Sequence, residues 1–497
     1  MKKRIFAFLL SLCLFFTGCS SAGTISTYTM VVDRMPSNLD PQVATAPQDI
    51  LAITNTFDGL FEYVDGEIVP NVCQSYTVSP DNKTYTFTLR QDSFFYISSK
   101  EKQVVTSHDF AFALERILDE KTMSPYRKDF ENIKSVQTPD DFTLVVNLIE
   151  GDSAFLSRLC MSCAMPCNEE FFVSTKGAYG LSVKNTLSNG PFTVNYLADD
   201  GSYATLIRVT EKQGGIDRIR VSLDKKETPP ETQYNNDSIS GYFADGDITA
   251  DGTVIDCSNS GLSMYFDLEN AQLANKNVRT ALAWFCLGMK NSGANLDMVN
   301  QDFSIFTDSI TLGESRLNDV IVPKMPTYMS QNPKEMLAQA YSELDTNKLE
   351  NITVLVPNDT KYSVIIENIN QLWQKNLGLF LTLEYLPSAE IEQRIARGNF
   401  DIAFYSYKPA ADNPLLFISP YRDYHGELPG YIDRIDSLSG RSDANSWIAG
   451  AQNIILENAL CVPMCTDHSG YIHKSYFEGV QINPFGNIVN LKYATVK

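Results

Sequence analysis

The chain has few of the residues that mark several common classes of protein. Its 497 residues include 4 histidines and 3 tryptophans, and 60 acidic residues outnumber 40 basic ones. Nucleic-acid binding needs concentrated Lys and Arg to neutralise phosphates, so a formal charge of −20 argues against a nucleic-acid partner. The sequence contains no G-x-S-x-G, H-E-x-x-H or phosphate-binding glycine loop. We therefore assign no catalytic residue and no cofactor, and expect a protein that is not an enzyme.

Cysteine is also sparse for a chain of this length. Eight of the ten cysteines lie beyond residue 19, too few for a disulfide scaffold, which belongs to short chains. Two groups have spacings that would suit a metal, namely Cys160-x-x-Cys163-x-x-x-Cys167 and Cys461-x-x-x-Cys465 with His468 and His473. Both groups lie in apolar stretches, so we favour buried structural thiols and predict no metal site. A disulfide within the first group is the alternative.

The apolar run at the start of the chain is too short to span a membrane. Lys2, Lys3 and Arg4 precede a run over residues 5–16, whereas a spanning helix needs about 20 residues. Residues 1–18 are therefore predicted to be a secretory signal peptide. Phe16-Thr17-Gly18-Cys19 resembles the lipobox of bacterial lipoproteins, which implies that Cys19 is lipidated and that residues 19–27 form a tether. We expect an extracytoplasmic body of charge −23, anchored at the outer face of the cell membrane.

Residue patterns predict alternating strands and helices along the body. Strands are expected over residues 28–32, 84–89, 142–149 and 192–196, and helices over 48–57 and 107–118. In the second half, strands over 352–356, 380–386 and 401–405 alternate with helices over 362–377 and 389–397 that end at Gly378 and Gly398. This alternation predicts an α/β domain with partly parallel strands. Residues 225–256 are rich in Asp, Gly, Asn, Pro and Ser and have weak periodicity, and we expect a crossing between domains near the end of this segment.

Several motifs, in their order along the chain, resemble the extracytoplasmic solute-binding proteins of ABC importers, specifically family 5, the oligopeptide, dipeptide and nickel group. They are Leu39-Asp40-Pro41, Phe57-Asp58-Gly59-Leu60, Glu115-Arg116-Ile117-Leu118-Asp119, Asn189-Gly190-Pro191-Phe192, Val278-Arg279-Thr280-Ala281-Leu282, Gln371-Leu372-Trp373-Gln374-Lys375-Asn376-Leu377-Gly378 and Gly398-Asn399-Phe400-Asp401. The resemblance covers residues 28–497.

This resemblance implies an α/β fold of two lobes, the periplasmic-binding-protein-like fold in its type II, large cluster C form, with a hinge and an interlobe cleft. The expected organisation is lobe I over 28–260 with a sub-domain at about 71–185, lobe II over 261–464, and a return to lobe I over 465–497. The implied function is capture of a solute, foremost an oligopeptide, and delivery by a monomeric carrier to an ABC permease and its ATPase subunits. A surface ligand sensor, or a binder of a sugar or metal complex, is the alternative.

The resemblance also places the ligand at the end of the strand over 401–405. The implied ligand-binding residues are Tyr405, Ser406, Tyr407, Lys408 and Asp412. Peptide-binding members of the family carry an aspartate three residues after the aromatic residue, where it pairs with the peptide's amino terminus, but this chain has Ala410. A buried ammonium group without a partner costs several kcal/mol. Either Asp412 supplies the charge or the ligand lacks a free amino terminus.

Overall fold

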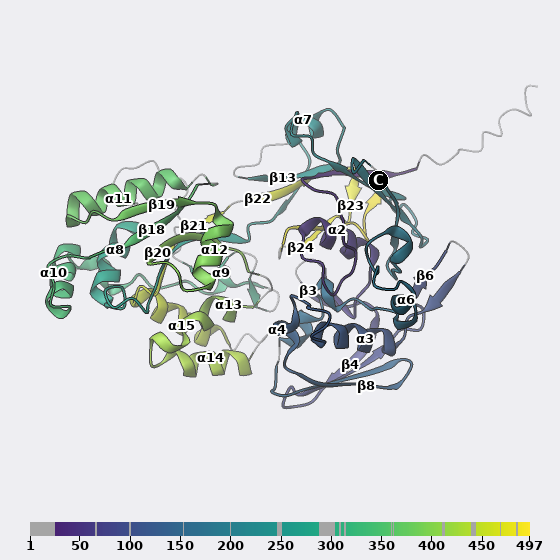
Figure 1. The fold of residues 1–497 in the computed structure, drawn as a ribbon, viewed down its shortest axis with the longest axis horizontal. Coiled ribbons are helices and arrows are strands. Elements are labelled where there is room, and N and C mark those ends of the chain that lie inside the picture. Colours follow the sequence, from purple (N-terminus) through teal and green to yellow (C-terminus); the bar gives the residue numbers. More distant parts are fainter. Residues whose placement is uncertain are drawn as a thin grey trace, which may run out of the picture.

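The structure is a computed structural model, which describes residues 25–64, 67–98, 101–152, 154–198, 200–245, 251–287, 304–307, 310–312, 315–358, 360, 362–409, 413–438, 444–467, 469–483 and 486–497. The predicted signal peptide and Cys19 lie outside these residues. The chain forms two bodies that lie side by side, with a group of strands between them (Figure 1). Across the described residues, no helix combines the length and apolarity needed to cross a membrane. The predicted two-lobe α/β fold is confirmed.

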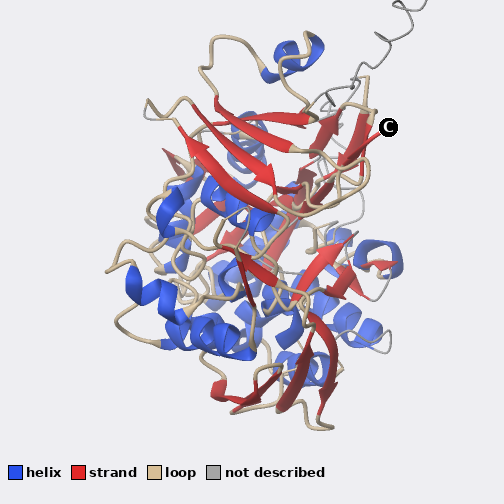
Figure 2. Ribbon diagram, turned by 90° about the vertical axis from the view of Figure 1, so that its right-hand side faces the viewer, coloured by secondary structure: helices blue, strands red, loops and turns tan. Residues whose placement is uncertain are grey.

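The larger body, lobe I, contains the N-terminal part of the chain and two four-stranded sheets. Its elements are β1 (Thr27–Val32), α2 (Pro47–Thr56), β2 (Phe61–Val64), β3 (Glu67–Pro70), β4 (Cys73–Val78), β5 (Thr84–Leu89), β6 (Phe94–Tyr96), β7 (Lys102–Val104), α3 (Ser107–Leu118), α4 (Arg127–Phe130), β8 (Ile133–Asp140), β9 (Thr143–Leu148), α5 (Phe155–Arg158), α6 (Glu169–Ser174), β10 (Phe192–Leu197), β11 (Tyr203–Arg208), β12 (Arg218–Leu223) and α7 (Pro230–Asn235). One sheet has the order β1-β12-β11-β10 and the other the order β4-β5-β9-β8. Figure 2 looks onto this body, with long strands across the top of the view and helices beneath them.

The smaller body, lobe II, is built on one five-stranded sheet. Its elements are β15 (Ser260–Phe266), α8 (Lys276–Leu287), β16 (Thr311–Leu312), β17 (Ser315–Arg316), α9 (Leu317–Val320), α10 (Pro333–Glu343), β18 (Thr353–Pro357), α11 (Ser363–Leu377), β19 (Thr382–Leu386), α12 (Ser388–Ala396), β20 (Ile402–Tyr407), α13 (Leu415–Ile418), α14 (Leu428–Ser437), α15 (Asn445–Glu457) and β21 (Cys461–Asp467). The strand order is β19-β18-β20-β15-β21. Val354 and Val356 pack in the core with α8 and α11, whereas Leu355 packs with Ile391 of α12. Both faces of β18 are therefore buried, which explains its continuous apolar sequence.

A three-stranded sheet joins the two bodies. Its strands are β13 (Gly241–Asp245), β14 (Thr253–Asp256) and β22 (Ser469–His473), and β22 lies between the other two. The chain passes from β14 to β15 of lobe II and comes back from β21 to β22, after which β23 (Phe477–Glu478), β24 (Gln481–Asn483), β25 (Ile488–Asn490) and β26 (Thr495–Val496) complete lobe I. We propose that these two crossings are the hinge and mark the lobe boundaries.

The elements with strong local signals form as expected. Helix α3 spans Ser107–Leu118, as predicted, and begins with a capping box, in which the Thr106 backbone N–H donates to the Asp109 carboxylate at 2.7 Å. The predicted parallel pairing is confirmed, because β18 is parallel to both β19 and β20. Gly378 ends α11 with a φ of +70°, a left-handed conformation that glycine adopts without steric cost.

Residues 225–256, where local periodicity is weak, include regular structure. That segment contains α7, β13 and β14, and both strands pair with β22. The partner strand lies more than 200 residues further along the chain, so the pairing depends on tertiary context. Strand formation of this kind is weakly encoded in local sequence.

Lobe I holds a buried ion pair between two of the motifs that carry the family resemblance. The Arg116 guanidinium donates to both Asp40 carboxylate oxygens, at 3.0 and 2.6 Å, and both side chains are less than 10% exposed. Arg116 also donates to the side-chain oxygen of Gln42 and stacks over the Phe172 ring at 4.2 Å. Gly180 is required at this site because a Cβ there would lie 2.2 Å from the Asp40 nitrogen. The pair fixes α3 to the chain that follows β1.

We predict that Arg116→Met lowers the free energy of unfolding by about 3–5 kcal/mol, because it leaves the Asp40 carboxylate buried without a counter-charge. Urea denaturation followed by circular dichroism measures this loss. The matched control is Arg127→Ala, which removes an arginine from an exposed pair with Glu120 at 3.3 Å and should cost no more than about 1 kcal/mol. Equal losses in the two variants would contradict the prediction.

Candidate ligand-binding site

A cavity of about 490 Å³, here called the cleft cavity, is lined by residues from both lobes. Lobe II contributes Lys408 and Pro409, which follow β20, and Asn259 lies on the crossing from β14 to β15. The rest of the lining belongs to lobe I and comprises Thr45, Pro47, Ile50, Thr54, Glu62, Tyr63, Tyr126, Ser157, Cys160, Met161, Ser162, Met165, Gln481, Asn483, Gly486, Asn487, Ile488, Asn490 and Lys492. Ligand bound here would contact both lobes, as interlobe capture requires.

Much of the polar lining comes from the C-terminal return segment, which the sequence analysis did not connect with the ligand. Gln481, Asn483, Asn487 and Asn490 all line the cleft cavity. Helix α2 holds this segment through Asn55, whose side chain donates to the Val489 carbonyl at 2.8 Å and accepts from the Leu491 N–H at 2.8 Å. The available signal was the run of carboxamides over 481–490, because amides both donate and accept hydrogen bonds.

One wall of the cleft cavity contains the buried Glu62 and Lys492, which form a group of charges with the half-buried Asp58, here called the cleft triad. The Lys492 ammonium lies 2.7 Å from an Asp58 oxygen and 3.6 Å from Glu62 Oε2. The Tyr493 hydroxyl donates to the other Glu62 oxygen, Oε1. Burial acts to lower the pKa of Lys492, but the attraction of Asp58 and Glu62 outweighs it, so the pKa is raised and the lysine stays charged. The triad holds two carboxylates and one ammonium.

Tyr405 and Tyr407 lie apart from this cavity, on one face of β20, as the two-residue period of a strand requires. They line a second cavity of about 470 Å³ within lobe II, here called the lobe II cavity, together with Phe417, Tyr421 and Glu392 among others. The Tyr407 ring meets Phe417 edge-on at 5.1 Å. Burial raises the pKa of both tyrosines, so their hydroxyls remain protonated hydrogen-bond donors.

The other predicted ligand residues take different positions. Lys408 is exposed and lines the cleft cavity. Ser406 points to the face opposite the tyrosines, and its hydroxyl is buried without a hydrogen-bond partner in the described part of the chain. Ala410 and Asp412 lie outside the described residues. The structure thus brings Lys408 to the cleft and Tyr405 and Tyr407 to the neighbouring lobe II cavity, and all five assignments remain predictions.

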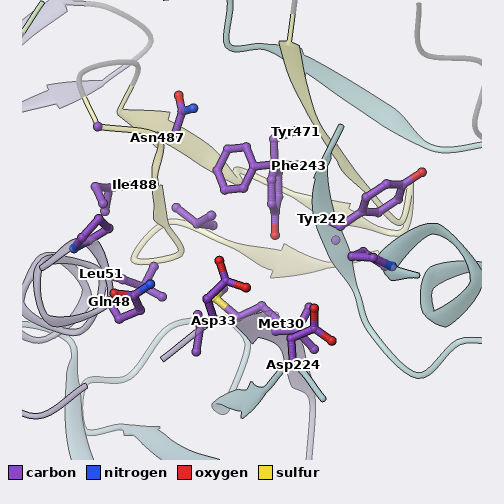
Figure 3. Close-up of a pocket in the computed structure, with 17 residues that line it drawn as sticks. Met30, Asp33, Gln48, Leu51, Asp224, Tyr242, Phe243, Tyr471, Asn487 and Ile488 are labelled. Atoms are coloured by element: carbon purple, nitrogen blue, oxygen red, sulfur yellow. The ribbon is translucent and has the colours of Figure 1, made fainter. Parts of the chain in front are cut away.

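A third cavity of about 420 Å³, the hinge cavity, lies in lobe I beside the joining strands. Phe243 and Tyr471 lie together at its centre, and the carboxylates of Asp33 and Asp224 lie on the same side of the view, near Met30 (Figure 3). The two rings are 4.8 Å apart. Asn487 and Ile488 line both this cavity and the cleft cavity, so the two adjoin.

The cysteine groups occupy core positions. Cys160, Cys163 and Cys167 are buried, and the Cys167 sulfur accepts from Arg116 at 3.5 Å. Burial raises the pKa of Cys167 to about 12, so its thiol is protonated and is a poor metal ligand. Cys461 and Cys465 are buried on β21, the edge strand of the lobe II sheet, and His468 lies outside the described residues. Where the chain is described, no three His, Cys, Asp or Glu side chains converge as a metal site.

Comparison with known proteins identifies the family. The profile of bacterial extracellular solute-binding proteins, family 5, matches residues 67–427, most of the chain. The chain therefore belongs to this family of extracellular solute-binding proteins, as the sequence motifs indicated.

Two relatives and one solved structure define the likeness further. The chain is 31% identical to the oligopeptide-binding protein SarA of Streptococcus gordonii over 203 residues, which are 37% of this chain and 30% of SarA. It is 24% identical to the oligopeptide-binding protein OppA of Bacillus subtilis, over 86% of this chain and 85% of OppA. The unliganded open form of the murein tripeptide-binding protein MppA of Escherichia coli superposes with a TM-score of 0.71 at 18% identity, covering 96% of this chain and 99% of that one.

We predict that Lys492→Met lowers the free energy of unfolding by about 3–5 kcal/mol, because it leaves the buried Glu62 and the half-buried Asp58 without a counter-charge. Urea denaturation measures the loss. Lys408→Met is the matched control, since Lys408 is an exposed lysine of the same cavity, and should change stability by no more than about 0.5 kcal/mol. A loss in Lys492→Met no larger than in the control would show that the triad is not a buried ion pair.

Proposed function

We propose that the protein captures oligopeptides outside the cytoplasm and delivers them to an ABC importer consisting of a permease and its ATPase subunits. The observation that carries this proposal is a cavity that both lobes line and that is rich in carboxamide side chains. Peptide backbones present N–H and C=O groups in alternation, and carboxamides can satisfy both kinds of group. The names of the relatives support the same ligand class, because SarA and OppA are oligopeptide-binding proteins.

The joining sheet supports a capture mechanism based on movement of the lobes. β14 leads into β15 of lobe II and β21 of lobe II leads into β22, so both described connections between the lobes are short, and they belong to two neighbouring strands of the joining sheet. Ligand that contacts both lobes favours the closed arrangement by its differential affinity for that state. Family 5 proteins are binding proteins, and we propose that this chain acts as a monomer and leaves its ligand chemically unchanged.

A lipid at Cys19 would give the carrier a second property. The tether over 19–27 leads into β1, the first strand of lobe I. The anchor is therefore joined to the lobe that provides most of the lining of the cleft cavity. Tethering raises the effective concentration of a carrier at a membrane permease without any new contact. We therefore propose that the mature protein stays at the outer face of the cell membrane.

We predict that short peptides bind the body of the protein and that Tyr407→Ala weakens this binding by about tenfold, or about 1.4 kcal/mol. The substitution removes a ring that lines the lobe II cavity beside the cleft. Isothermal titration with a peptide library measures affinity, and unfolding should be stabilised by about 2.7 kcal/mol at a hundredfold ligand excess over the Kd.

The control for this prediction is Lys348→Ala, which removes an exposed lysine of lobe II that pairs with Glu350 at 3.0 Å. It should leave peptide affinity unchanged. Stabilisation by sugars or metal complexes, with none by peptides, would contradict the ligand class and leave the capture function intact. Unchanged affinity in Tyr407→Ala would show that the lobe II cavity does not contact the ligand.

We predict that Cys19→Ala releases the protein from membranes, because the substitution removes the sulfur to which the lipid is attached. Fractionation of cells and incorporation of labelled fatty acid measure the change. Cys13→Ala is the matched control, because Cys13 lies within the apolar run of the signal peptide and should leave anchoring intact. Cys19→Ala protein that remains in the membrane fraction and retains label would disprove anchoring at this residue.

A further inference from the structure

The cleft triad contains two carboxylates and one ammonium group, so one negative charge is not neutralised within the triad. Asp58 lies 2.7 Å from the Lys492 ammonium and forms the close pair, whereas Glu62 Oε2 lies 3.6 Å away, beyond hydrogen-bond distance. Lys492 and Asp58 therefore balance one another, and Glu62 is the additional carboxylate. The two carboxylates share one lysine, and a buried group with an excess of one sign of charge is unfavourable, so this wall of the cleft favours a cation from outside the triad.

Glu62 also has a free hydrogen-bond acceptor. Its Oε1 atom accepts from the Tyr493 hydroxyl, but among the described residues its buried Oε2 atom has no donor within hydrogen-bond distance, since the Lys492 ammonium lies 3.6 Å away. The residue is 7% exposed and lines the cleft cavity. Buried acceptors are almost always satisfied in folded proteins. The missing donor and the missing positive charge at Glu62 can be supplied together by one ammonium group.

The carboxylates of the other two cavities are less suited to this role. Asp33 of the hinge cavity is exposed to solvent, and Asp224 already accepts from the Lys226 N–H at 3.0 Å. In the lobe II cavity, Glu392 is exposed and Glu269 accepts from the Tyr424 hydroxyl at 2.9 Å. Charge interactions are strongest where water is excluded. Of these three cavities, the cleft cavity is the one that both lobes line. Glu62 is the buried carboxylate in its lining.

We propose that Glu62 of lobe I receives an ammonium group of the captured ligand in the cleft cavity, either the amino terminus of a peptide or a lysine side chain. This inference rests on the proposed function in peptide capture. It places the amine of the ligand at lobe I, whereas the aspartate position of peptide-binding family members, which is Ala410 in this chain, belongs to lobe II. In the complex, the ligand N–H donates to Glu62 Oε2, and the ligand charge neutralises the triad. Glu62 then selects for ligands with a free amine.

The test compares peptides with a free and an acetylated amino terminus, and peptides with lysine or its neutral isostere norleucine, by isothermal titration. On the natural chain, loss of the amine should weaken binding at least about 30-fold, the lower end of the usual range for a buried charge that loses its partner. The Glu62→Gln variant should bind the amine and amine-free peptides equally. Its urea denaturation midpoint should not fall, because Lys492 and Asp58 remain a one-to-one pair.

Two control variants separate this site from its alternatives. Glu67→Gln changes an exposed carboxylate on β3, which pairs with the strand that carries Glu62, and should keep the preference for amines. Asp412→Asn tests the other carboxylate that the sequence analysis named for the amine, and any loss of affinity in this variant should be equal for peptides with and without the amine. A preference that persists in Glu62→Gln, or disappears in Asp412→Asn, would overturn the inference. Equal affinity for peptides with and without each amine would overturn the inference and leave the proposed function standing. A lack of binding by every peptide would overturn both.

Discussion

The wall of the cleft depends on the buried ion pair between Asp40 and Arg116. Arg116 also donates to the Gln42 side chain, whose amide nitrogen in turn donates to the carbonyls of Cys163 and Met165 at 2.9 and 3.0 Å. Met165 lines the cleft cavity. A bidentate arginine fixes direction as well as distance, so the pair orients the segment that lines this side of the cleft. Cys163 enters this network through its backbone carbonyl, and its side chain packs in the core of lobe I.

The motifs that indicated the family lie at junctions of the scaffold. Asn189 exchanges two hydrogen bonds with the Asp58 backbone, at 3.0 and 2.8 Å, and so joins two of the motifs. The Trp373 indole donates to the Leu282 carbonyl at 3.1 Å and joins two more. Asp401 accepts from the Thr353 N–H at 2.9 Å and ties β20 to β18. These residues specify how elements meet, which is why the sequence could predict the fold and the family.

The ligand site was much less predictable, for a physical reason. Local periodicity and capping signals define single elements such as α3 and α11, but the cleft is assembled from segments that are distant in the chain. Asn55 holds Val489 and Leu491, more than 430 residues away, and nothing local in either segment encodes that contact. Side chains along β20 point alternately to opposite faces of the sheet, and this separates the predicted ligand-binding residues. Tyr405 and Tyr407 line the lobe II cavity, whereas Lys408, which follows the strand, lines the cleft cavity.

The charge balance of the cleft connects the scaffold with the ligand. Two carboxylates around one lysine leave an excess negative charge on this wall. Tyr493 donates a hydrogen bond to Glu62 but brings no charge. In the proposed complex a cationic ligand would offset this excess, and its binding free energy would include that gain. Alanine at position 410 is then compatible with recognition of an amine, because the opposing charge comes from lobe I.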